Sequence, residues 1–167
     1  MHEIASMEGL DRLFPLSCVF VLSVDETGKP SGMVASWFMQ TSHDPPQVAL
    51  SVGKKRYTCE LIQKNREFVI AIPNLEMRKY ISVFGYTSGR SVDKFKESKI
   101  SFTKGKYTKV PLLTEATFNY ECKVANEIET GDHILFIGDV VSAWTNVNKK
   151  VLMSMGYVNN ERTFEEF

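Results

Sequence analysis

The last third of the chain contains two long apolar segments that are separated by one tight turn. Residues 116–128 and 134–144 are rich in β-branched and aromatic side chains, and Glu129-Thr130-Gly131-Asp132 lies between them. Gly and Asp are typical of turns that join antiparallel strands, because they tolerate the backbone angles that such turns require. This pattern predicts a long antiparallel hairpin and favours a mainly β fold.

Shorter strands are predicted before this hairpin. Residues 16–24 and 33–41 flank a turn at 25–30, and residues 48–52 and 68–72 are short apolar runs bounded by Pro or Gly. Helical spacing of apolar residues predicts helices at 1–13, from Thr58 onward, at 77–84 and at 91–97, with Ser91 as the cap of the last.

The order of these elements limits the architecture. The first three strands follow one another with only turns between them, which disfavours a parallel doubly wound sheet. We therefore expect an antiparallel barrel decorated with helices, formed by one domain of residues 1–167. The tail from residue 146 is polar, with residues 151–153 as its one predicted apolar anchor.

Composition and charge exclude several classes of function. The 20 Lys and Arg residues balance the 20 Asp and Glu residues, whereas nucleic-acid-binding proteins are usually basic. The longest apolar run, residues 18–22, is too short to cross a membrane, and residues 1–6 do not look like the start of a signal peptide. Three scattered cysteines without a Cys-x-x-Cys pair indicate neither a disulfide framework nor a zinc site. We expect a cytoplasmic protein with no nucleic acid, membrane or metal partner.

A candidate anion site follows the strand at 48–52. Three consecutive cations, residues 54–56, come directly after Gly53, and Thr58 is the predicted N-cap of the next helix. Backbone N–H groups at the start of a helix, together with basic side chains, bind anions. A solvated turn is the alternative for such a run.

Three other segments contain unusual groupings. Residues 32–38 place small side chains beside Trp37, which suits a flat ligand against an aromatic wall or, alternatively, ordinary core packing. Residues 84–95 crowd glycines, hydroxyls and cations before a helix start, which suits an anion or is a flexible surface loop. His133 opens a strand directly after a turn, where a histidine is more often structural than catalytic, although its usual pKa lies near neutrality.

Together these segments resemble the flavin reductase-like family of split β-barrel FMN-binding proteins, which includes flavoredoxin and an archaeal ferric reductase. The resemblance runs in unbroken order over roughly residues 14–144, and little of it is found after about residue 146. The similar segments are Gly32-Met33-Val34-Ala35-Ser36-Trp37, Asp44-Pro45-Pro46, Ser51-Val52-Gly53 with Arg56-Tyr57-Thr58, Ser88-Gly89-Arg90 with Asp93-Lys94-Phe95, and Gly131-Asp132-His133 with Phe136-Ile137-Gly138.

The resemblance implies an FMN cofactor and a role for each matching residue. The isoalloxazine ring would be lined by Ala35, Ser36 and Trp37. The ribityl chain and phosphate would be held by Ser51, Arg56, Tyr57 and Thr58. The pyrimidine edge or the phosphate would be reached by Ser88, Gly89, Arg90 and Lys94. His133 would lie where a nicotinamide approaches. The residues alone predict the anion site but not a flavin.

The leading functional prediction is an NAD(P)H:flavin oxidoreductase that passes hydride to FMN. An FMN-carrying electron-transfer protein of the flavoredoxin kind, without nicotinamide turnover, is one alternative, and a flavin-free barrel that serves as a binding module is another. We also expect a homodimer, because the two long apolar strands at 116–144 would expose their edges in a lone small barrel. The resemblance implies the same assembly.

Overall fold

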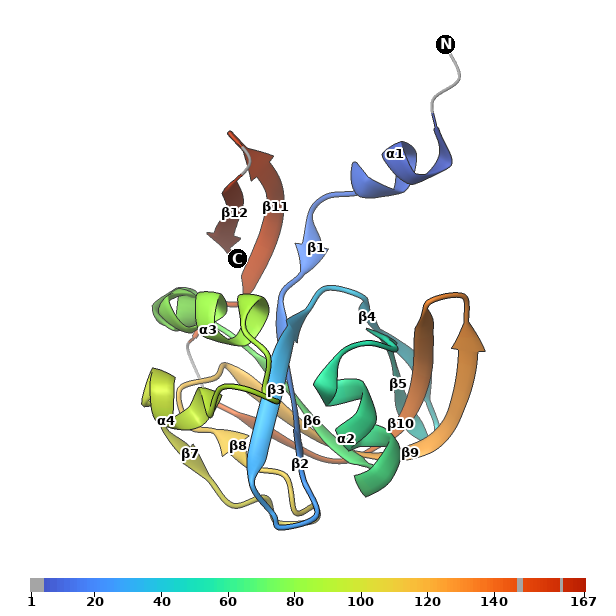
Figure 1. Cartoon of the computed structure of the whole chain (residues 1–167), viewed down its shortest axis with the longest axis vertical. Helices are drawn as coiled ribbons and strands as arrows, with labels where there is room; N and C mark the ends of the chain where they lie inside the picture. Colours follow the sequence, from blue (N-terminus) through green and yellow to red (C-terminus); the bar gives the residue numbers. More distant parts are fainter. Residues whose placement is uncertain (1–4, 147–148, 160) are drawn as a thin grey trace.

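The computed structural model describes residues 5–146, 149–159 and 161–167. Its main sheet has seven strands, and every neighbouring pair in it is antiparallel (Figure 1). In spatial order the strands are β3 (Pro30–Ala35), β2 (Val19–Val24), β6 (Glu67–Ile72), β9 (Phe118–Thr130), β10 (His133–Thr145), β5 (Pro46–Gly53) and β4 (Phe38–His43).

The sheet curls because β3 and β4 lie at its opposite edges although only Ser36 and Trp37 separate them in the chain. The three residue steps from Ala35 to Phe38 span at most about 11 Å, so the two edges must approach each other. β3 pairs with β2 and β4 pairs with β5, so the ladder is not closed between the edges. This split barrel confirms the predicted mainly β class. The single strand predicted at 33–41 is wrong, because it is two strands with different neighbours.

Two apolar cores lie on the two faces of the central strands. Side chains alternate along a strand, so Val19 and Val21 of β2 enter one core while Phe20 and Leu22 enter the other. The core that contains Val19 and Val21 is covered by α2 (Tyr57–Asn65), which contributes Ile62. The core that contains Phe20 and Leu22 is covered by the helices that come after β6. These helices are η1 (Leu75–Tyr80), α3 (Ile81–Tyr86) and α4 (Lys94–Ser98).

The long hairpin is confirmed as β9 and β10, which are joined at Gly131 and Asp132. Gly131 has a φ of 54°, which explains the glycine at the turn. β6 covers residues 118–123 of β9, and β5 covers residues 133–139 of β10. The remaining parts of both strands have no strand partner on their outer side within the described chain.

Two helix caps differ from the prediction. α2 begins at Tyr57 with Arg56 as its N-cap, and Thr58 is a buried residue of the first turn. α4 begins at Lys94, and its N-cap is Asp93, whose carboxylate accepts a hydrogen bond from the Lys96 N–H. An aspartate is a strong cap, so it takes this position in place of the predicted Ser91.

The tail is a hairpin and not a polar extension with one apolar anchor. β11 (Leu152–Val158) pairs with β12 (Glu161–Glu166) and with β1 (Leu16–Ser17), and this sheet stands away from the main one (Figure 1). Beyond β1, α1 (Ser6–Asp11) projects from the body and buries none of its residues. Residues 1–4 of the predicted N-terminal helix lie outside the described residues.

A short two-stranded sheet completes the structure. It consists of β7 (Phe102–Thr103) and β8 (Leu112–Leu113). Among the helices of the described ranges, none has the length and apolar character needed to cross a membrane.

Candidate functional site

The first part of the candidate site is the N-terminus of α2. Arg56, the N-cap residue, provides no side-chain hydrogen bond to the first turn. The leading N–H groups of this nine-residue helix therefore lack the usual side-chain cap, and the helix dipole places partial positive charge there. Among the described residues, neither Arg56 nor Lys55 forms an ion pair with a carboxylate.

Lys94, the first residue of α4, brings a further cation to the same place. Its side chain is buried, and Nζ donates to the carbonyl oxygens of Gly32 at 2.8 Å and Phe84 at 2.9 Å. An ammonium group has three N–H bonds, so one remains for a ligand. Burial, together with the nearby charge of Arg56, lowers the pKa of Lys94 to about 8. Like charges held near each other without a carboxylate between them are the arrangement expected of an anion site.

These cations line a hollow of about 210 Å³, which we call the cationic pocket. Its walls come from β3, the start of α2, α3 with the loop after it, and the start of α4. The lining residues are Met33, Lys55, Arg56, Tyr57, Thr58, Phe84, Gly85, Tyr86, Thr87, Ser88, Gly89 and Lys94. The lining contains three cations and three Ser or Thr hydroxyls but no carboxylate, so it suits a phosphate.

Gly89 allows the wall of this pocket to pack closely. A Cβ at residue 89 would lie 2.2 Å from Ser31 Oγ and 2.7 Å from Tyr57 Cδ1. Both distances are far below van der Waals contact, so any larger residue would push the loop away from β3 and α2. Glycine at this position therefore lets the loop after α3 pack closely against β3 and α2.

A flat aromatic surface lies at the ends of β4, β5 and β10. The rings of Trp37 and His133 are 4.6 Å apart between centroids and are tilted by 37°. Trp37 is 53% exposed, so it is a surface wall and not part of the core. His133 Nδ1 lies 2.7 Å from Asp132 Oδ1, which holds the ring at the turn.

Gly53 connects this aromatic surface to the cationic pocket. A Cβ built at Gly53 would lie 3.6 Å from His133 Nε2 and 3.7 Å from Arg56 Cγ. His133 and Arg56 therefore flank the same short stretch of backbone at the end of β5. The aromatic surface and the cationic pocket therefore adjoin at the end of β5.

Most of the predicted site residues belong to one of these two regions. Arg56, Tyr57, Thr58, Ser88, Gly89 and Lys94 line the cationic pocket. Trp37 and His133 form the aromatic surface, and the Ser51 N–H donates to the Trp37 carbonyl oxygen at 2.9 Å.

Three predicted residues have other contacts. Ala35 is buried in the core beneath α2. The Ser36 hydroxyl accepts a hydrogen bond from Arg162 Nη2 at 2.8 Å. Arg90 turns away from the cationic pocket and pairs with Glu60 at 2.9 Å, while its Nη1 donates to the Lys55 carbonyl oxygen.

Sequence reasoning missed Arg162 of β12, which also donates to Ser154 Oγ at 2.7 Å. A strand pattern in residues 161–166 was the available signal, but nothing local connected that strand to residue 36. In the described part of the chain, no three His, Cys, Asp or Glu side chains converge as a metal site would require.

Comparison with known proteins gives a family match. The family model described as "Flavin reductase like domain" matches residues 12–163. An uncharacterized protein of Archaeoglobus fulgidus is 36% identical over 139 residues, which cover 83% of this chain and 76% of that protein. A ferric-chelate reductase (NAD(P)H) of the same organism is 28% identical over 141 residues, which cover 83% of this chain and 82% of that protein.

Solved structures share the fold. The NADH:FAD oxidoreductase of Streptomyces globisporus C-1027 superimposes with a TM-score of 0.85 at 24% identity, over 100% of this chain and 96% of that chain. An FMN-binding protein of Thermus thermophilus gives a TM-score of 0.83 at 25% identity, over 98% of this chain and 94% of that chain. The split-barrel fold predicted from the sequence is confirmed by these likenesses.

Proposed function

The chain belongs to the flavin reductase-like family, and we propose that it binds FMN at the candidate site and catalyses hydride transfer from NAD(P)H to that flavin. The observation that carries the proposal is the cationic pocket, where Arg56 and Lys94 lie near each other without a carboxylate in the lining. A flavin phosphate would supply the missing negative charge.

The residues present fit the phosphate end of FMN. The N–H groups at the start of α2, the free N–H of Lys94, and the hydroxyls of Thr58 and Ser88 are the donors that a phosphate accepts from. The pocket is of phosphate and ribityl size, so the ring system of the flavin would lie outside it. The path along Gly53 leads to Trp37, which offers an exposed face for that ring.

Each residue then has a positioning role. Trp37 supports the flat ring, and Ser51 fixes the backbone of Trp37 through its N–H. His133 lies beside Trp37 and is held by Asp132, so its ring can place an incoming nicotinamide. When bound, the flavin supplies the redox chemistry by accepting the hydride, and imidazole has no part in that electron transfer.

The choice of FMN and of a nicotinamide donor is supported by several relatives, each by its name alone. The solved relatives are named as an FMN-binding protein and an NADH:FAD oxidoreductase, and the curated relative as an NAD(P)H-dependent ferric-chelate reductase. A flavoredoxin-like carrier and a flavin-free binding module are the competing functions, because both are compatible with the same fold. The cytoplasmic location stays a prediction.

Absorbance spectroscopy and one kinetic assay separate the three functions. The purified protein incubated with FMN and desalted should show flavin bands near about 370 and 450 nm, the values common to flavins. It should then oxidise NADH or NADPH in steady state when FMN is added. Bound flavin without nicotinamide turnover would favour the carrier, and a protein that stays colourless and inactive would favour the binding module.

A further inference from the structure

The hairpin of β11 and β12 reaches the candidate site through one side chain, that of Arg162. Its Nε donates to Ser154 Oγ at 2.7 Å, and its Nη2 donates to Ser36 Oγ at 2.8 Å. Ser154 is fully buried in β11, where it pairs with Leu16 of β1. One planar guanidinium therefore connects this hairpin to the residue that follows β3.

Packing within the hairpin also fixes the guanidinium. Arg162 lies opposite Tyr157 in the ladder of β11 and β12, and its Cζ is 5.9 Å from the centroid of the Tyr157 ring. That ring meets Phe14 edge-on, with 6.2 Å between the two centroids. A guanidinium is attracted to the face of an aromatic ring. The hairpin therefore orients Arg162 through Ser154 and Tyr157, and the remaining contact reaches out to Ser36.

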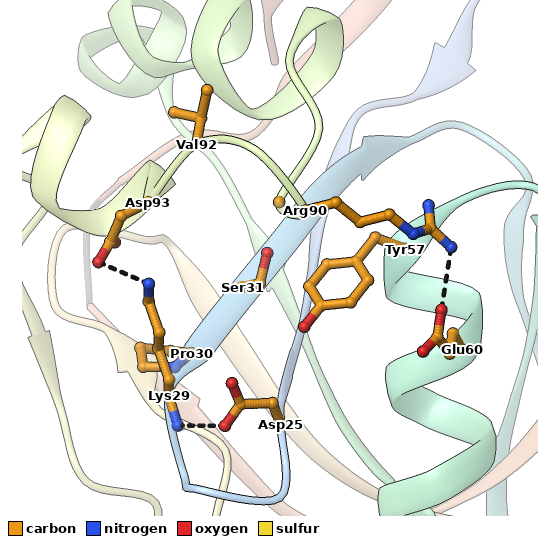
Figure 2. Close-up of a pocket in the computed structure, with 10 residues that line it drawn as sticks. Asp25, Lys29, Pro30, Ser31, Tyr57, Glu60, Arg90, Val92 and Asp93 are labelled. Atoms are coloured by element: carbon orange, nitrogen blue, oxygen red, sulfur yellow. Dashed lines mark hydrogen bonds and ion pairs between the residues drawn. The ribbon is translucent and has the colours of Figure 1, made fainter.

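Arg162 is not part of any ion pair among the described residues. The cations of the hollow beside the cationic pocket, which Figure 2 shows, are different, because Arg90 pairs with Glu60 at 2.9 Å and Lys29 pairs with Asp93 at 3.2 Å. The described hydrogen bonds of Arg162 go to neutral hydroxyl groups. Its contribution is therefore the fixed direction of its N–H groups and not an ion pair.

Ser36 and Trp37 connect β3 to β4, which lie at opposite edges of the split barrel. The Trp37 carbonyl oxygen accepts a hydrogen bond from the Ser51 N–H at 2.9 Å, which holds the backbone of this connection on one side. The Trp37 side chain is 53% exposed, so the core does not fix its ring. Arg162 holds the neighbouring side chain, Ser36, from outside the main sheet.

We propose that Arg162 is a positioning residue of the candidate site, and that the hairpin of β11 and β12 is thereby part of this site. By holding Ser36, the guanidinium fixes the connection between β3 and β4 and so the place where Trp37 presents its ring. A flat ligand binds more tightly to a wall that is already ordered, because less conformational entropy is lost on binding. The inference rests on the proposed function, since it takes Trp37 as the wall for the flavin ring.

The first test compares FMN with riboflavin by fluorescence titration. Arg162→Met keeps an unbranched side chain and removes both donors. The contact lies at the ring end of the site, so the affinities for FMN and riboflavin should fall by the same factor, about threefold to tenfold. A loss for FMN alone would place Arg162 at the phosphate and overturn the inference.

Arg78→Met is the matched control for this variant. The Arg78 guanidinium lies 5.9 Å from the ring centroid of Phe164 in β12, so the same chemical change removes a contact to the same hairpin without affecting Ser36. FMN and riboflavin should bind Arg78→Met as they bind the wild type. Equal losses in Arg78→Met and Arg162→Met would mean that any weakening of the hairpin lowers the affinity, which overturns a specific role of Arg162.

The second test needs no flavin. Hydrogen exchange at the Ser51 amide reports on the connection between β3 and β4, because this amide donates to the Trp37 carbonyl oxygen. In the flavin-free protein, the amide should exchange about threefold faster or more in Arg162→Met, and at the wild-type rate in Arg78→Met. Faster exchange confined to β11 and β12 would show that Arg162 only stabilises its own hairpin, and the inference would fail.

Two further variants keep the test valid if Arg162→Met disturbs the hairpin. Ser36→Ala leaves the contacts of Arg162 within the hairpin in place and should lower both flavin affinities, and adding Arg162→Met to it should cause little further loss. Additive losses would contradict the proposed contact. Arg162→Lys keeps the charge without the planar pair of donors, so it should resemble Arg162→Met, and full recovery of affinity by lysine would overturn the inference.

The two tests distinguish failure of this inference from failure of the proposed function. If the wild type binds FMN and Arg162→Met binds both flavins equally well, the proposed function stands and the inference is overturned. If even the wild type binds no flavin while exchange at Ser51 responds as expected, Arg162 still holds Ser36, but its role at a flavin is rejected together with the proposed function.

Discussion

Arg56 is the residue whose replacement tests the phosphate role most directly. Arg56→Ala removes a charge-assisted hydrogen bond worth roughly 1.5–3 kcal/mol, so FMN affinity should fall about ten- to a hundredfold. Riboflavin lacks the phosphate and should bind wild type and variant nearly equally. Fluorescence titration with both ligands measures the two affinities. Equal losses for FMN and riboflavin would show that Arg56 acts on folding or on the ring.

From the lowered pKa of Lys94 we predict that FMN binding depends on pH. Its pKa of about 8 means that the free protein loses this charge as the pH rises through 8. A bound phosphate favours the ammonium form and raises that pKa, so binding above pH 8 takes up a proton. FMN affinity should therefore be flat between about pH 7 and 8 and fall by up to about tenfold per pH unit above pH 8, until the raised pKa is reached.

Riboflavin and a second variant are the controls for this pH dependence. Riboflavin carries no phosphate, so its affinity should not follow the titration of Lys94. Lys94→Met removes the titrating group and should give weaker FMN binding without the step above pH 8. An FMN affinity that is constant between pH 7 and 10 in wild type would contradict the assigned contact.

His133 has two competing roles, which a pair of variants separates. As a group that places the nicotinamide, His133→Ala should raise the KM for NAD(P)H while FMN affinity changes little. If His133 only stabilises the turn, it acts through the 2.7 Å contact between its Nδ1 and Asp132 Oδ1. Asp132→Ala should then lower the Tm as much as His133→Ala does. Equal losses of Tm in the two variants, with an unchanged KM for NAD(P)H, would contradict a role of His133 in positioning the nicotinamide.

At the scale of elements, Glu121 anchors the loop between β7 and β8. This fully buried carboxylate accepts hydrogen bonds from the backbone N–H groups of Lys106, Tyr107 and Thr108 and from Trp144 Nε1. Burial opposes its charge, but the hydrogen bonds from Trp144 and the loop outweigh that effect and lower its pKa.

Glu121→Ala should therefore cost roughly 3–5 kcal/mol in the free energy of unfolding, because the buried Thr108 N–H and three part-buried donors lose their acceptor. Urea unfolding measures the cost, and hydrogen exchange should show faster exchange at residues 106–108. Glu129→Ala, at an exposed position of the same strand, is the control and should cost far less. A Glu121→Ala protein as stable as this control would contradict the anchoring role.

Local patterns in the sequence predicted the elements that depend on local chemistry. The β9–β10 hairpin was predicted from its apolar runs and its glycine turn, and the cations at 54–56 were correctly placed at a helix start. The split of residues 33–41 into β3 and β4 was not predictable in this way. The nearly continuous apolar run of residues 33–39 has no Gly or Pro to mark a break, and the break arises because the curled sheet gives the two strands different neighbours.

Partners far away in the sequence also explain why some site side chains have contacts other than those expected. The resemblance implied that Arg90 reaches the pyrimidine edge or the phosphate, but its guanidinium pairs with Glu60, 30 residues earlier in the chain, and does not line the cationic pocket. Arg162 reaches Ser36 across 126 residues, and no local pattern indicates that contact. Residue type indicated side chains that line the cationic pocket and the aromatic surface, whereas their orientation depends on partners that only the fold brings together.

At the scale of the whole molecule, several groups of apolar side chains in the described part of the chain are exposed to solvent. Phe118, Tyr120 and Val140 line an apolar hollow of about 440 Å³, and Phe118 and Tyr120 stack with their rings nearly parallel. α1 projects from the body with Met7 and Leu10 more than half exposed (Figure 1). Exposed apolar patches and open strand edges in one chain favour association with another copy.

We therefore predict a homodimer, which light scattering at micromolar concentration should detect as twice the 19.0 kDa of one chain. Phe118→Asp should shift the protein toward the monomer, because a charge in an apolar interface loses its hydration without gaining a partner. Leu75→Asp is the control, since Leu75 lies in η1 and not in β9 or β10, is 47% exposed and does not line this hollow. A wild-type mass of one chain would contradict the prediction, as would equal dissociation by both variants.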